Sequence, residues 1–190
     1  LIFYTEEFGK FLTNSEIYNI FRDNKLVLYF LFENKILNFD HYIVNGILKS
    51  KKKKYPNYFI NEIKPFINEK VFKEIELENQ NNQIDMDPEI FEKNRRKGEN
   101  ESKLCQLVRN DDIDEFITYV SLNDISPQTE INNSTFETNS LLIRKIPNLI
   151  EYAAFHGSVQ IFRYLYMNGE KPKPYVWIYA VHGDNPELIR

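Results

Sequence analysis

Residues 148–169 read NLIEYAAFHGSVQIFRYLYMNG, and this stretch decides the fold class that we expect. The paired small residues Ala153 and Ala154 let one helix approach a neighbour closely, and Gly157 permits a tight turn into a second helix. Gly169 can adopt the left-handed geometry that ends the second helix. The apolar face of that helix is formed by Ile161, Phe162 and Leu165. The stretch therefore predicts an antiparallel helix pair with a one-sided core.

The same pattern occurs once upstream and once downstream. The upstream copy aligns Val108, Asp111, Phe116 and Val120 with Ala154, Gly157, Phe162 and Tyr166. The downstream copy aligns Trp177, Ala180, Asp184 and Leu188 with Ile150, Ala153, Gly157 and Ile161. We expect helix pairs at about 101–121, 147–169 and 175–190, the last incomplete. The predicted repeat core is Val108, Phe116, Val120, Ala153, Ala154, Gly157, Ile161, Phe162, Leu165, Gly169, Trp177 and Ala180.

The central copy also resembles an ankyrin repeat. The family pattern Leu-x-x-Ala-Ala-x-x-Gly, then Ile-Val-x-x-Leu-Leu-x-x-Gly, is matched at Ile150, Ala153, Ala154, Gly157, Ile161, Phe162, Leu165, Tyr166 and Gly169. The usual Thr-Pro-Leu-His opening is missing, because Asn148 and Leu149 replace Thr-Pro and Glu151 replaces His. Neither spacing between copies equals the ankyrin period of about 33 residues. The first gap holds an inserted polar loop, roughly 121–139.

Four further segments, 97–100, 116–120, 136–140 and 149–155, extend the resemblance. Together they resemble the ankyrin-associated domain-of-unknown-function family that is expanded in some single-celled parasitic eukaryotes. The resemblance covers the chain from about Arg95 onward and extends loosely over the N-terminal helices. It implies an all-α fold, with an N-terminal helical region at 1–96 and an ankyrin-like α-solenoid at 97–190. It also implies that the protein has no enzymatic activity.

The N-terminal half has helical signals of its own. A plausible N-cap at Asn14 opens a short helix, and the apolar run 26–32 is read as a helix because no second β-like run lies nearby. Apolar residues over 39–48 repeat at helical steps, and a break is expected near Lys64, before a proline. The polar stretch 76–83 lacks an apolar period and predicts a linker. A further helix is expected to open at Asp87-Pro88 and to end near Gly98.

Composition indicates a folded protein of a reducing compartment. Of the 190 residues 42% are hydrophobic and 15% aromatic, which is unlike a disordered chain. Lys and Arg total 24 and Asp and Glu 28, so the net charge of -4 argues against binding to nucleic acid or anionic membranes. A single cysteine cannot form an internal disulfide, so we expect an intracellular protein, cytoplasmic rather than nuclear. The longest apolar run, 26–32, predicts no membrane insertion.

No catalytic or metal-binding pattern stands out. The sequence has no Gly-rich phosphate loop, paired-cysteine motif, nucleophile elbow or His-Glu-x-x-His motif. His41, His156 and His182 are far apart in sequence, whereas a metal site needs converging ligands. Cys105 is predicted to be a small buried residue rather than a nucleophile. We therefore expect no metal, no cofactor, no small-molecule substrate and no catalysis.

A partner surface is predicted where each helix pair turns. The candidate contact residues precede the three inter-helix turns and are Arg109, Asn110, Phe155, His156 and His182. They should line one edge and be partly exposed, and they would bind a protein of unknown identity. His156 is either a plain turn residue or a partner contact, and Phe155 is either core or a contact residue.

The basic runs and the two ends of the sequence lead to two further expectations. The basic runs 51–54 and 95–97 keep a nucleus-associated, nucleic-acid-contacting protein as the alternative, although each run also fits a solvated helix end. The chain begins at Leu1 rather than Met, and its last copy stops within the outer helix. We therefore expect a fragment of a longer array.

Overall fold

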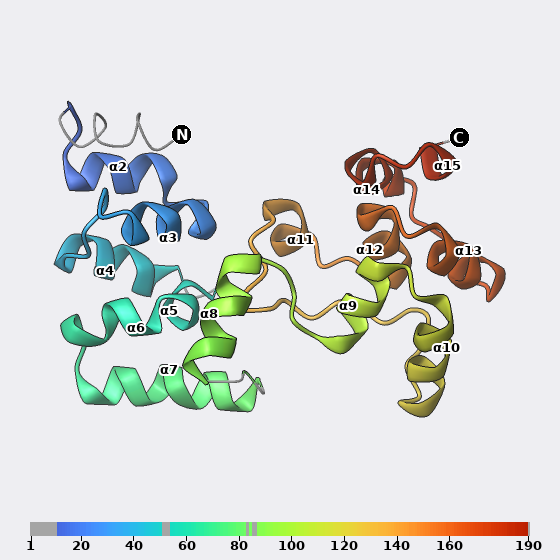
Figure 1. Ribbon diagram of the computed structural model, residues 1–190, viewed down its shortest axis with the longest axis horizontal. Coiled ribbons are helices and arrows are strands. Elements are labelled where there is room, and N and C mark those ends of the chain that lie inside the picture. Colours follow the sequence, from blue (N-terminus) through green and yellow to red (C-terminus); the bar gives the residue numbers. More distant parts are fainter. Residues whose placement is uncertain (1–10, 51–53, 83, 85–86, 190) are drawn as a thin grey trace. The chain divides into compact units, whose positions relative to one another are not determined.

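The computed structural model describes residues 11–50, 54–82, 84 and 87–189. Over these residues the secondary structure is helical, apart from one isolated β-bridge between Glu130 and Asn148 (Figure 1). The chain forms two compact units. Unit 1 contains the described residues up to Glu99 together with Ser134–Ser140, and unit 2 contains Asn100–Asn133 and the described residues from Leu141 onward. The division after Glu99 lies beside the 96/97 boundary expected from the sequence.

Unit 1 is a series of short helices. They are α2 (Asn14–Phe21), α3 (Lys25–Glu33), α4 (His41–Lys49), α5 (Tyr55–Tyr58), α6 (Ile60–Ile63), the 3-10 helix η2 (Lys64–Phe66), α7 (Glu69–Asn81) and α8 (Pro88–Lys97). Helix α2 packs on α3 and α4, α4 packs on α5, and α5 and α6 pack on α7 (Figure 1). Side-chain N-caps begin most of these helices, at Thr13, Asn24, Asp40, Asn68 and Asp87. The first cap is Thr13 rather than the predicted Asn14.

The predicted linker at 76–83 is wrong, because most of it belongs to α7. Ile75 buries an apolar side chain just before the polar stretch. Within the stretch Asn79 is buried, and its Oδ1 accepts a hydrogen bond of 2.9 Å from Nδ2 of buried Asn57. A satisfied amide pair therefore holds a helix that has no continuous apolar period. The break predicted near Lys64 is confirmed as η2.

The segment 134–140 belongs to unit 1, although the sequence placed it in a polar loop of the second half. Phe136 is fully buried and packs edge-on against Phe91, with ring centroids 5.2 Å apart. The backbone N–H and the hydroxyl of Thr138 donate to the carbonyl of Gly98 at 3.0 and 2.8 Å. One aromatic side chain in a polar stretch thus recruits the segment to the unit 1 core.

Unit 2 is built from helix pairs. Its helices are α9 (Lys103–Asn110), α10 (Ile113–Leu122), α11 (Ser140–Arg144), α12 (Leu149–His156), α13 (Val159–Met167), α14 (Val176–Gly183) and α15 (Pro186–Ile189). Helix α12 packs against α9, α13 and α14, while α10 packs against α9 and α13 (Figure 1). The pairs α9/α10, α12/α13 and α14/α15 therefore lie side by side, and α9, α12 and α14 form one row.

The three aligned turn positions adopt the same backbone conformation. Asp111, Gly157 and Asp184 end α9, α12 and α14 in the left-handed region, with φ of 51°, 68° and 47°. The carboxylate of Asp111 also accepts hydrogen bonds from the backbone N–H groups of Gln160 and Ile161 at 3.1 and 3.0 Å. One turn therefore caps the first turn of α13 in the next pair.

Most of the predicted repeat core is buried. The fully buried members are Val108, Phe116, Ala153, Ala154, Ile161, Leu165 and Ala180. Phe162, Val120 and Gly157 are partly buried, whereas Gly169 is exposed and has a positive φ of 93° at the end of α13.

Trp177 is a correction, because its side chain is 62% exposed. Its aligned counterpart Ile150 is buried, since α12 has neighbours on both sides. Helix α14 packs chiefly on α12, and it does so through Tyr179 and Ala180. The close approach also needs Gly183, where a Cβ atom would collide with the carbonyl oxygen of Ala154. The face of α14 that carries Trp177 is left exposed.

Candidate functional site

The residues before the three turns are brought to one edge of unit 2. Because α9, α12 and α14 lie in one row and end in the same conformation, their last turns are neighbours. We call this set the turn edge, and its members are Arg109, Asn110, Tyr152, Phe155, His156 and His182.

A continuous set of contacts links five members of the turn edge, namely Arg109, Tyr152, His156, Phe155 and His182. Arg109 Nη1 donates a hydrogen bond of 2.8 Å to the hydroxyl of Tyr152. The ring of His156 lies 4.5 Å from the Tyr152 ring and 4.9 Å from the Phe155 ring. The Phe155 ring is in turn stacked on His182, at 3.8 Å and 17°. These five side chains therefore form one connected cluster from three helices.

Exposure differs sharply within the cluster. Phe155 is only 4% exposed and also contacts Tyr179, so it is a core residue and not an exposed partner contact as the sequence allowed. His182 and Asn110 are exposed, whereas Arg109 and His156 are partly buried. The buried ring of Phe155 thus forms a platform for the exposed ring of His182.

His156 is the most perturbed group of the cluster. Burial, together with the charges of Arg109 and His182, lowers its pKa to about 4, so the ring is neutral near pH 7. Its Nε2 atom is buried and has no hydrogen-bond partner. Leaving such an atom unsatisfied costs about 1–3 kcal/mol of stability.

One acidic residue that is adjacent to the turn edge in sequence, Asp111, is already engaged. The carboxylate of Asp111 is held by the N–H groups at the start of α13. Its negative charge therefore serves the N-terminus of that helix, where the helix dipole favours it.

An apolar stripe on α14 continues the edge. We call it the α14 stripe, and it consists of the exposed residues Trp177, Ile178 and Val181. Ile178 and His182 are one helical turn apart, as are Trp177 and Val181, so each pair shares a face. The stripe and the ring of His182 therefore form one exposed surface.

Sequence reasoning missed Tyr152 and Asp111 as parts of this arrangement. Tyr152 precedes His156 by one helical turn, a spacing that places both side chains on one face. The alignment of Asp111 with Gly157 identified it as a turn residue. The hydrogen bond that its carboxylate accepts from the backbone N–H of Ile161 joins two helix pairs, so it could not be read from local sequence.

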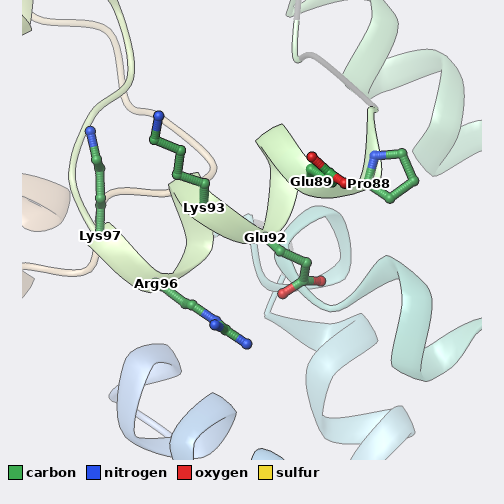
Figure 2. Close-up of a pocket in the computed structure, with 6 residues that line it drawn as sticks. All are labelled: Pro88, Glu89, Glu92, Lys93, Arg96 and Lys97. Carbon is green, nitrogen blue, oxygen red and sulfur yellow. The ribbon is translucent and has the colours of Figure 1, made fainter.

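A separate pocket of about 750 Å³ lies beside α8 in unit 1. Its lining residues within the described chain are Pro88, Glu89, Glu92, Lys93, Arg96 and Lys97, all from that helix (Figure 2). Glu92 and Arg96 extend to one side of the helix and Lys93 and Lys97 to the other (Figure 2). Glu92 accepts from the hydroxyl of Tyr29 at 2.6 Å. A single helix wall with diverging side chains supplies no converging group for chemistry.

Of the basic run 95–97, Arg95 is buried, whereas Arg96 and Lys97 are exposed. Arg95 is 1% exposed, and both of its Nη atoms donate to the carboxylate of Glu62, at 2.9 and 2.7 Å. Arg96 donates to Glu33 at 2.8 Å. The guanidinium of Arg95 is therefore taken up by its bidentate pair with Glu62 and is not available to a phosphate. Of the other run, residues 51–53 lie outside the described residues.

Other sequence expectations concern metals, membranes and Cys105. Over the described residues no cluster of three or more His, Cys, Asp or Glu side chains could hold a metal ion. In the same part of the chain, no helix has the length and apolar character to cross a bilayer. Cys105 is buried in the core of unit 2, as predicted.

Comparison with known proteins identified no relative: no family model, no curated protein and no solved structure matches the chain.

Proposed function

We propose that this chain is a non-catalytic interaction module that binds another protein through the turn edge and the α14 stripe. On this view the three helix pairs are divergent ankyrin-type repeats that work in the cytoplasm. The repeat assignment is supported by the shared left-handed turns at Asp111, Gly157 and Asp184. It is also supported by the buried pair Ala153 and Ala154 in the central helix of the row.

The observation that carries the proposal is the stacked pair of Phe155 and His182, which belongs to one contact cluster with Arg109 and to a helix that also exposes Trp177. Arginine and aromatic side chains contribute most of the binding energy at protein interfaces. The His182 ring is already held on a buried ring, so binding would immobilise it at little further entropic cost. Side chains from three neighbouring helices give the extended surface that repeat proteins use for binding.

Site-specific photo-crosslinking tests the proposal. A photoreactive amino acid at exposed Asn110 should crosslink to a discrete protein in extract from the source cells. The same amino acid at exposed Leu122, at the far end of α10, is the matched control and should give no such product. Adding the substitution Trp177→Ala to the Asn110 probe should reduce the crosslink. A product that forms equally from Leu122 and is unaffected by Trp177→Ala would contradict binding at this surface.

A further inference from the structure

Another pocket, of about 540 Å³, lies in unit 1 between α2 and α4. Asn14 at the start of α2 donates a hydrogen bond of 2.8 Å to the N-cap residue Asp40 of α4. Further along both helices, the Tyr18 ring of α2 occupies the space that a side chain at Gly46 of α4 would need. The two helices therefore run in the same direction, and their C-terminal ends line one pocket.

Two cationic side chains, one from each helix, line this pocket. Arg22 directly follows α2, and Lys49 is the last residue of α4. Both side chains are exposed, and within the described part of the chain neither forms a hydrogen bond or an ion pair. Asp23 supplies the acidic side chain among the described lining residues, and it has an interaction of its own. Positive charge is therefore in excess at the pocket, and both cations are accessible to a ligand.

Other lining groups of the pocket suit a molecule with hydroxyl groups. Asn45 is exposed, and its side-chain amide can both donate and accept hydrogen bonds. The Tyr42 ring is 54% exposed, and its hydroxyl accepts from Nδ2 of Asn19 at 3.1 Å and donates to Oδ1 of the same residue at 3.2 Å. This ring also packs edge-on against Tyr18, with centroids 6.2 Å apart. The pocket therefore offers an aromatic ring that is already held in place beside a free amide.

We infer that this pocket of unit 1 binds a small phosphorylated sugar. A phosphate monoester carries about -1.5 to -2 charges at pH 7, which matches two cations better than the single charge of a carboxylate does. The guanidinium of Arg22 would donate to two phosphate oxygens, and the ammonium of Lys49 to the third. The sugar hydroxyls would bond to Asn45, and the sugar ring would cover Tyr42. The volume of about 540 Å³ lies within the range of about 300–1,000 Å³ that is usual for small-molecule sites.

A free sugar phosphate fits this pocket better than a phosphate on a membrane or on a protein. The chain has a net charge of -4, which disfavours approach to an anionic lipid surface. A phosphorylated serine would bring a phosphate on a single methylene group, and it would leave the Asn45 amide and the Tyr42 ring unused. The lining groups therefore favour a ligand that carries a hydroxyl-rich ring next to its phosphate.

Calorimetric titration of the whole 190-residue chain with glucose-6-phosphate and with ribose-5-phosphate tests the inference. At least one of them should bind. Arg22→Gln and Lys49→Gln should each weaken binding about tenfold or more, because each removes a charge-assisted hydrogen bond. Asn45→Asp keeps the shape of an exposed side chain but adds a negative charge, so it should also weaken binding. Lys70→Gln, which changes an exposed lysine of α7 outside the pocket lining, is the matched control and should leave the affinity unchanged.

Further probes separate the two halves of the site. Glucose and inorganic phosphate should each bind more weakly than the sugar phosphates, because each lacks one half of the ligand. Equal affinity for inorganic phosphate would overturn the sugar assignment. Tighter binding of a phosphoserine peptide, or of phosphatidylcholine vesicles that contain a phosphorylated inositol lipid, would overturn the inference in favour of a protein or a membrane ligand.

Two other results would also overturn the inference. One is that neither sugar phosphate binds, and the other is that Lys70→Gln weakens binding as much as Arg22→Gln does. The variants change exposed side chains, and their melting temperatures should stay close to that of the wild type. All of these outcomes concern unit 1, so they leave the proposal for the turn edge of unit 2 untouched.

Discussion

The imidazole of His182 is stacked on the ring of Phe155, with centroids 3.8 Å apart and planes inclined by 17°. The first residue is exposed and belongs to α14, whereas the second is buried and belongs to α12. The contact therefore joins the packing between two helix pairs to the surface that we propose binds a partner. We therefore expect substitutions of Phe155 to lower the stability of unit 2, and substitutions of His182 to affect binding with little effect on stability.

Phe155→Ala should destabilise unit 2 by about 3–5 kcal/mol, because it leaves a cavity at a buried site. His182→Ala should cost less than about 1 kcal/mol, since it removes an exposed ring. Chemical denaturation of both variants measures the difference. Equal losses of unfolding free energy would show that the stacked pair is not divided into a core and a surface residue.

The same substitution at two aligned turns should have opposite effects. Asp184→Gly should stabilise the protein by about 0.5–1 kcal/mol, because glycine relieves the positive φ at an exposed position. Asp111→Gly should destabilise it, because the lost cap on α13 is worth about 1–2 kcal/mol and outweighs that relief. Thermal melts of the two variants decide the matter. A stabilised Asp111→Gly would mean that the bond between neighbouring pairs contributes nothing.

The low pKa of His156 predicts a pH-dependent loss of stability. The unfolded ring titrates near pH 6.5 and the folded ring near pH 4, so below about pH 6.5 the unfolded state takes up the proton first. Stability should fall by up to about 3 kcal/mol between these values. The difference between the wild type and His156→Gln, measured by denaturation from pH 7 to pH 4, isolates this group from the carboxylates. A difference that stays constant with pH would contradict the burial of a neutral ring.

Ala154→Glu should unfold unit 2, because it buries an unpaired charge where α12 meets its neighbours. Met167→Glu introduces the same residue at an exposed position and should leave the melting temperature unchanged. Circular dichroism melts compare the two. A wild-type melt for Ala154→Glu would show that α12 is not the central helix of the row.

Local sequence patterns predicted the features that depend on local chemistry. The alignment of Asp111, Gly157 and Asp184 identified three turns whose backbones have the same left-handed conformation. Small residues at Ala153 and Ala154 predicted the most closely packed helix.

Features that depend on distant residues could not be predicted in this way. The burial of Arg95 requires Glu62, which is far away in sequence, and the helix at 76–81 requires the amide of Asn57. Trp177 has the spacing of a core residue, but its burial depends on whether another helix covers that face of α14. Four of the contact residues predicted from the sequence are at least partly exposed in the turn edge. The stacking of His182 on the buried ring of Phe155 could not be predicted, because it joins two helix pairs.

The most direct measurement is hydrogen–deuterium exchange of the chain alone and in complex with the protein captured by the Asn110 crosslink. We predict slower exchange on binding in the last turns of α9, α12 and α14, and no change in α8. Protection of α8 with unchanged exchange at the turn edge would contradict the account.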